Sequence, residues 1–230
     1  MSVNDVHVVG AFVGSRRFLS DFGQTRKAGG GGPHPHLCYT SPMELTESLI
    51  KAREERAEKY CTLVAEFPHL KSEQVLSYLR ASDYFTAPSS YKRHGAWIGG
   101  NFDHSVTVTE LLLRFTEEEG LKWEREESPY IIGLFHDLCK NDQRGFKMKN
   151  DNLKIVSREC PDQRHGDRSV ELIEENIIKL TEEEKECILY HMGVYGGDEE
   201  YQQEMAKAMA HNPNIAFVQK ADTLAARAGI

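Results

Sequence analysis

From residue 41 onward the sequence repeats one local pattern, in which an apolar stripe at helical spacing follows a helix-capping signal. Residues 41–44 (SPME) and 181–184 (TEEE) each have the form of a capping box, and Pro42 suits a first helical position. Only residues 146–156 alternate like strands, around an Asn-Asp-Asn turn. Because neither a βαβ alternation nor a fixed repeat is present, the pattern predicts an all-α domain with a possible small β-hairpin.

The capping signals and apolar stripes predict where most of the helices lie. Ser72 can cap one helix, Gly120 can end the helix that starts at His104, and Ser128-Pro129 can open another. A first helix after residue 41 should bury Leu45, Leu49 and Ile50. The other expected helices cover 73–82, 104–120, the segment that contains 131–140, 165–177, 186–193, 199–210 and 215–227.

Residues 1–40 have a different composition from the rest of the chain. The segment KAGGGGPHPH at 27–36 holds four glycines and two prolines, which disfavour both helix and sheet. We therefore expect an irregular N-terminal arm at 1–40 and a helical domain at 41–230. His34 and His36 lie in this linker-like segment, and we read them as part of a linker rather than as a metal-binding tract.

The composition restricts the classes of function that this chain can have. With 230 residues and 40% apolar residues, the chain is long enough for one well-packed domain. The formal net charge of −8 disfavours nucleic-acid binding by the whole surface but allows a local basic site. Five cysteines without a CxxC pair indicate reduced thiols and a cytoplasmic protein. No apolar run approaches the ~20 residues of a membrane span, so we expect no membrane association.

Several expected helices carry a histidine or aspartate on an apolar face. The stretch IIGLFHDLCK at 131–140 runs from apolar residues into an adjacent imidazole and carboxylate. Taken singly, such residues are more often caps or satisfied core residues. Together they are costly to bury unless they are paired or bind a metal ion, and this ligand set suits Fe, Mn, Zn, Co or Ni better than Ca. The residues concerned are His104, His136, Asp137, His165, His191 and Asp222.

The His136-Asp137 doublet and Lys140 after it can each contribute to a metal site in a particular way. Neighbouring helical residues point about 100° apart, so His136 and Asp137 can reach one ion near a helix end, and the second carboxylate oxygen can bridge to another ion. Lys140 lies one turn after His136, where its ammonium can hold a phosphate. A solvated helix terminus is an equally good interpretation of Lys140.

The order His104, His136-Asp137, Asp222 resembles the H…HD…D signature of the HD-domain superfamily of metal-dependent phosphohydrolases. HDLCK resembles the HDxxK form, and His165 and His191 resemble the extra histidines of the two-metal branch. Residues 84–108 resemble the region before the first ligand in bacterial and phage HD hydrolases, although IGGNFDHS replaces the usual EGGLxEHS. The likeness covers about residues 72–227.

This resemblance implies an HD-type helical bundle and a divalent metal site of one or two ions. It places His104, His136, Asp137 and Asp222 around one ion and His165 and His191 on a second, with Asp137 bridging. Asp137 and Lys140 would then be catalytic, through a metal-activated hydroxide that attacks a phosphomonoester or phosphodiester. Substrate-binding candidates are His94, Arg93 and Arg168.

The resemblance leaves the substrate open. A phosphorylated small molecule, above all a nucleotide, is the first expectation. A nuclease is the second, because residues 84–108 also resemble HD domains of a bacterial 3′–5′ exoribonuclease and of some relaxases. A di-iron oxygenase and a catalytically idle binding module are the remaining alternatives, and an oligomer is compatible with all of them.

Overall fold

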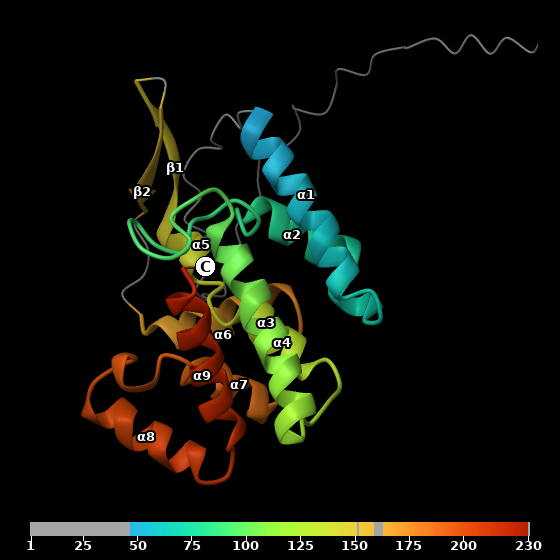
Figure 1. The fold of residues 1–230 in the computed structure, drawn as a ribbon, viewed down its shortest axis with the longest axis vertical. Coiled ribbons are helices and arrows are strands. Elements are labelled where there is room, and N and C mark those ends of the chain that lie inside the picture. The colour runs from blue at the N-terminus through green and yellow to red at the C-terminus, as the bar shows by residue number, and fades with distance from the viewer. Residues whose placement is uncertain (1–46, 151, 159–162, 230) are drawn as a thin grey trace, which may run out of the picture. The chain divides into compact units, whose positions relative to one another are not determined.

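The structure is a computed structural model that describes residues 47–150, 152–158 and 163–229. Helices dominate it, and the only strands in this described part form one two-stranded sheet (Figure 1), so the all-α prediction is confirmed. The elements are α1 Glu47–Leu63, η1 Pro68–Lys71, α2 Glu73–Ala81, α3 Gly100–Glu119, α4 Ser128–Phe135, α5 Lys140–Gln143, β1 Arg144–Lys149, β2 Asn152–Ser157, α6 His165–Asn176, α7 Glu182–Leu189, η2 Gly193–Tyr195, α8 Glu199–Met209 and α9 Asn214–Arg227.

Three of the sequence expectations lie outside the described residues. They are the arm at 1–40 with His34 and His36, the capping box at 41–44, and Leu45. The division of the chain at residue 40 therefore stays a prediction.

Local sequence signals set several element boundaries as expected. The Ser72 hydroxyl accepts a hydrogen bond from the backbone N–H of Val75 at the start of α2. Thr181 and Glu184 form the complete capping box of α7, and Gly120 ends α3 with a φ of 69°. The strands β1 and β2 pair antiparallel, so the expected hairpin is confirmed.

The structure corrects four of the detailed expectations. Helix α7 runs from Glu182 to Leu189 rather than over 186–193, so His191 lies in the turn after it. Helix α3 begins at Gly100 rather than at His104, because Gly99 turns the chain at a φ of 75° and Arg56 binds the carboxylate of Asp103 in the first turn. Ile50 is 42% exposed and does not share the buried face of Leu49. The helix that contains IIGLF ends at Phe135, so the next four residues form a turn before α5.

An aromatic cluster anchors the end of α4. The rings of Tyr60, Tyr84, Phe85, Phe102 and Phe135 lie within about 6 Å of one another in a chain of contacts, and all five are fully buried. The Tyr84 hydroxyl donates a hydrogen bond of 2.5 Å to the carbonyl of Leu134. This packing holds the backbone rigidly just before the His136-Asp137 doublet.

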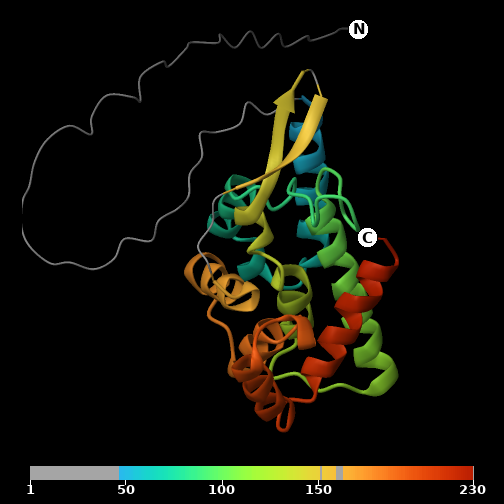
Figure 2. The same cartoon turned by 90° about the vertical axis from the view of Figure 1, so that its left-hand side faces the viewer.

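Helices α3 and α4 cross at a glycine. A Cβ atom on Gly133 would lie 2.4 Å from Oγ1 of Thr109 and 2.6 Å from its Cα, so only glycine permits this approach. Helix α9 runs beside α3 in both views (Figures 1 and 2). The bundle thus brings α3, the end of α4 and α9 together, although they are far apart in the sequence.

None of the described helices combines the length and apolar character needed to cross a lipid bilayer.

The crossing at Gly133 yields a stability prediction. We expect Gly133→Ala to lower the free energy of unfolding by about 1–3 kcal/mol, because the added methyl overpacks the backbone of Thr109. Alanine is the better helix former by about 1 kcal/mol, so helix propensity alone would raise the stability. Urea unfolding of both proteins measures the difference. A variant at least as stable as the wild type would show that the two helices can separate at no cost.

Candidate metal centre

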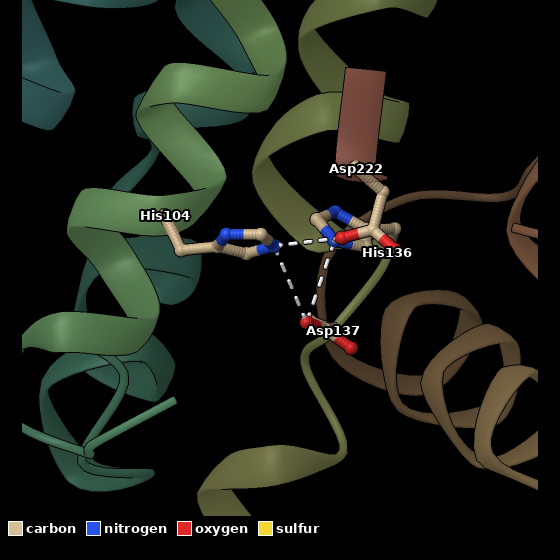
Figure 3. A group of neighbouring side chains, drawn as sticks. All are labelled: His104, His136, Asp137 and Asp222. Atoms are coloured by element: carbon tan, nitrogen blue, oxygen red, sulfur yellow. Dashed lines mark hydrogen bonds and ion pairs between the residues drawn. The ribbon is translucent and has the colours of Figure 1, made fainter. Parts of the chain in front are cut away.

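Four polar side chains converge between α3, the turn after α4, and α9 (Figure 3). His104 comes from the second turn of α3, His136 and Asp137 follow α4, and Asp222 lies on α9. Nε2 of His104 lies 2.9 Å from Oδ1 of Asp222 and 3.7 Å from Oδ2 of Asp137. Nε2 of His136 lies 3.4 Å from the same Oδ2 and 3.8 Å from Oδ1 of Asp222. We refer to these four residues as group 1.

Asp137 also belongs to a second group, which contains the two remaining histidines. His165 is the first residue of α6, and His191 lies in the turn after α7. Their Nε2 atoms lie 2.5 Å and 3.5 Å, respectively, from Oδ1 of Asp137. We call Asp137, His165 and His191 group 2. One carboxylate therefore turns Oδ2 to group 1 and Oδ1 to group 2.

Backbone carbonyls orient two of the histidines. Nδ1 of His136 donates to the carbonyl of Gly133 at 3.0 Å, and Nδ1 of His191 donates to the carbonyl of Ile188 at 2.7 Å. Each ring therefore directs its Nε2 atom into the cluster. Both Nε2 atoms are buried and have no hydrogen-bond partner among the residues that the structure describes. Buried, unpartnered nitrogens that face carboxylates fit a bound divalent ion, and histidine metal ligands have this kind of backbone support.

In His165 the Nδ1 atom faces a thiol rather than a backbone carbonyl. Nδ1 of His165 lies 3.0 Å from Sγ of Cys139. Burial raises the pKa of Cys139 to about 12, so the thiol is neutral at neutral pH.

The amide of Asn101 supports the turn that carries Asp137, because it donates to the backbone carbonyl of Asp137 and to the side chain of Asn141. Sequence reasoning missed both supporting residues, although Cys139 lies within HDLCK and Asn101 marks the departure from the usual motif.

The charges of the cluster suit a cation. Burial favours the neutral form of Asp137, but the charges of Lys140, His136 and His165 hold its pKa well below the usual range. Burial also favours the neutral form of Asp222, but the hydrogen bond with His104 and the nearby imidazole of His136 lower its pKa. Both carboxylates are thus ionised at neutral pH. Burial by itself would lower the pKa of His136, but the two carboxylates outweigh it and raise this pKa to about 10.

Lys140 points into the cluster and is only 9% exposed. Its Nζ contacts Oδ2 of Asp137 and lies 3.2 Å from the hydroxyl of Ser89. The backbone N–H of Ser89 is itself bonded to the carbonyl of Gly95 at 2.9 Å. The solvated helix terminus considered for Lys140 is therefore not what the structure contains. Ser89 is another residue that sequence reasoning did not single out.

The three substrate-binding candidates differ in position. The His94 ring lies 5.4 Å, centroid to centroid, from that of His104, and burial together with the charge of Lys140 lowers its pKa. Arg93 is exposed, and among the described residues no ion pair joins its side chain to either group. Arg168 is paired with Asp142 and Glu171, with N–O distances of 2.8 Å and 2.6 Å. Only His94 is therefore brought to the cluster.

Comparison with known proteins identifies one family for this arrangement. The model of the HD domain family matches residues 101–227, more than half of the chain, and this span contains all six residues of groups 1 and 2. Comparisons with curated proteins and with solved structures found no match. The chain therefore belongs to the HD domain family, whose membership implies a metal-dependent hydrolase.

Proposed function

We propose that this protein is a phosphohydrolase that cleaves a phosphomonoester or phosphodiester bond, most of all in a nucleotide. The observation that supports this proposal best is the shared carboxylate of Asp137. One of its oxygens faces group 1 and the other faces group 2. Nζ of Lys140 contacts Oδ2 of this carboxylate. Two adjacent cation sites next to a buried ammonium are suited to a substrate with concentrated negative charge.

Group 1 would hold one divalent ion and group 2 a second, with Asp137 shared between them. The ligand set fits Fe, Mn, Co, Ni or Zn. When bound, such ions lower the pKa of a water molecule and neutralise charge on phosphoryl oxygens. The backbone bonds to His136 and His191 keep their Nε2 atoms directed into the site without further reorganisation.

Lys140, Ser89 and His94 would act on the substrate. The Lys140 ammonium would bind a phosphoryl oxygen and stabilise the charge that develops on it. The Ser89 hydroxyl, 3.2 Å from Nζ, would keep this ammonium in place. Because its pKa is lowered, His94 is neutral at neutral pH and would give or take a hydrogen bond at the leaving oxygen.

A substrate panel tests the proposed reaction. The chelator-treated protein is reloaded separately with each of the five metals and incubated with nucleoside mono-, di- and triphosphates, cyclic nucleotides and a small chromogenic phosphodiester. Release of phosphate, nucleoside or chromophore supports hydrolysis. Oxygen consumption with a phosphonate and no hydrolysis would instead assign the site to a di-iron oxygenase. A protein that takes up no metal would correspond to an idle binding module.

The sharing of Asp137 predicts different metal contents for different variants. Asp137→Asn should lose ions from both groups, whereas His191→Ala should lose at most the ion of group 2. The activity of Asp137→Asn should fall more than about a hundredfold. Mutation of residues that only support metal ligands already lowers activity or metal affinity 10–100-fold, and Asp137 would be a ligand itself. Elemental analysis after reloading gives the ions bound per chain. Full metal content and activity in Asp137→Asn would refute the shared site.

Lys140 should separate metal binding from turnover. We expect Lys140→Ala to keep the metal content and to lose about 10²–10³-fold in kcat, the cost of removing one group that stabilises developing charge. Lys207→Ala, at an exposed position on α8, is the matched control and should behave as the wild type. If metal content falls together with kcat, Lys140 has a structural role in the site.

The raised pKa of His136 predicts that metal binding releases a proton. With a pKa of about 10 in the metal-free protein, His136 carries its proton at pH 8, and ligation through Nε2 must displace it. The apparent affinity should therefore rise with pH up to about 10, by as much as tenfold per unit. Calorimetry in two buffers of different ionisation enthalpy measures the protons released. A pH-independent affinity between pH 7 and 9 would contradict the assignment.

A further inference from the structure

The β-hairpin carries three lysines on one face. Lys147 and Lys149 alternate along β1 with residues of the opposite face, and the register places Lys154 of β2 directly across from Lys147. All three side chains are exposed, and none forms an ion pair with a described residue. We call Lys147, Lys149 and Lys154 the lysine face.

This concentration of positive charge is at odds with the rest of the chain. The sequence has 36 acidic against 28 basic residues, yet neither strand contains an acidic residue. Like charges directly opposite on a sheet destabilise the pairing. A bound polyanion would relieve the repulsion between Lys147 and Lys154.

The lysine face begins next to the metal centre. A Cβ atom on Gly145, which shares this face, would lie 2.2 Å from the guanidinium of Arg158, so Arg158 covers the root of the face. That guanidinium also donates to the carbonyl of Asn141 at 2.8 Å, and Asn141 directly follows Lys140. From this root the hairpin extends away from α5 (Figures 1 and 2).

The length of the hairpin distinguishes a polymer from a single nucleotide. Lys149 is five residues from the start of β1, which corresponds to about 17 Å along an antiparallel strand. A stacked nucleic-acid strand rises about 3.4 Å per nucleotide, so this length spans about five nucleotides. A mononucleotide held at Lys140 would not reach the lysines near the tip.

An aromatic side chain lies between the site and the hairpin. Tyr91 is 45% exposed, and the guanidinium of Arg144 lies 5.4 Å from its ring centroid. Arg144 also donates to the carbonyl of Ser89, the residue that contacts Lys140. Because Arg144 alternates with Gly145 along β1, Tyr91 lies on the side of the hairpin opposite the lysine face, at the root nearest Ser89 and Lys140.

We propose that the lysine face binds single-stranded nucleic acid and leads one of its phosphodiesters to the site at Lys140. The cleavage step rests on the proposed function, whereas binding to the hairpin does not. In that step a water oxygen bonds to phosphorus, the bond from phosphorus to the leaving oxygen breaks, and the leaving oxygen gains a proton. The narrow, projecting shape of the hairpin favours a flexible single strand over a flat membrane surface.

A binding experiment tests the hairpin independently of catalysis. Chelator-treated full-length protein is titrated against fluorescent 12-nucleotide single-stranded RNA and DNA, with anisotropy measured between 50 and 200 mM salt. The test variant is Lys147→Gln/Lys149→Gln/Lys154→Gln. The matched control is Lys59→Gln/Lys179→Gln/Lys207→Gln, which removes the same charge from exposed positions outside the hairpin. Equal thermal midpoints establish that all three proteins are folded.

The expected result is a loss that is confined to the hairpin variant. The slope of log K against log salt should fall by about two, since each phosphate contact in a single strand contributes roughly 0.7. The affinity at 50 mM salt should fall about tenfold or more, while the control binds as the wild type. Equal losses in both variants, or no binding by the wild type, would overturn the proposal. Binding to anionic vesicles but not to oligonucleotides would overturn it in favour of a membrane surface.

Metal-loaded protein separates this proposal from the proposed function. All three proteins should hydrolyse a small chromogenic phosphodiester equally, because that substrate does not reach the hairpin, and only the hairpin variant should lose cleavage of the 12-mer. If the wild type cleaves the small ester but neither binds nor cleaves the 12-mer, the hairpin proposal fails and the proposed function stands. If the wild type binds the 12-mer through the hairpin but hydrolyses nothing, the proposed function fails and the binding proposal stands.

Discussion

A buried carboxylate at position 137 determines much of how this molecule is organised. Asp137 is 1% exposed, and burial of a charge is tolerated only where partners surround it. Its partners come from α3, α6, the turn after α7, and Lys140. Because three of these partners lie far from residue 137 in the sequence, the bundle must close before they reach the carboxylate. The side chains of the candidate metal centre thus come together only in the closed bundle.

The helix end at Phe135 makes this convergence possible. A helix that continued through residues 136 and 137 would direct the two side chains about 100° apart. After Phe135 the backbone tightens into turns in which the N–H of Leu138 bonds to the carbonyl of Phe135. The aromatic cluster and the close approach at Gly133 fix where these turns begin. The carbonyl of Gly133 then orients His136. Packing of the apolar part of IIGLFHDLCK therefore positions its polar part.

Charge is distributed unevenly over the molecule, and the distribution bears on the substrate. The carboxylates of the centre stay ionised through neighbouring cations, and Lys140 is held inward by Asp137 and Ser89. Nearby arginines are largely neutralised, as Arg158 is by Asp83 and Arg168 by Asp142. The lysines of the hairpin are exposed and have no such partner among the described residues. They are the cations best placed to contact a long anionic ligand.

The sequence by itself determined the helical class, the hairpin, and the caps at Ser72 and Thr181, because caps and turn residues act over a few positions. It also identified the candidate histidines and aspartates, because their chemistry alone marks them as possible metal ligands. Local signals could not place the start of α3, which depends on Arg56 binding Asp103, or the exposure of Ile50. They also could not show that Cys139 meets His165, that Ser89 holds Lys140, or that Arg168 is occupied by carboxylates. Those contacts join residues 26 to 51 positions apart, and they depend on how the helices pack, which only the tertiary structure decides.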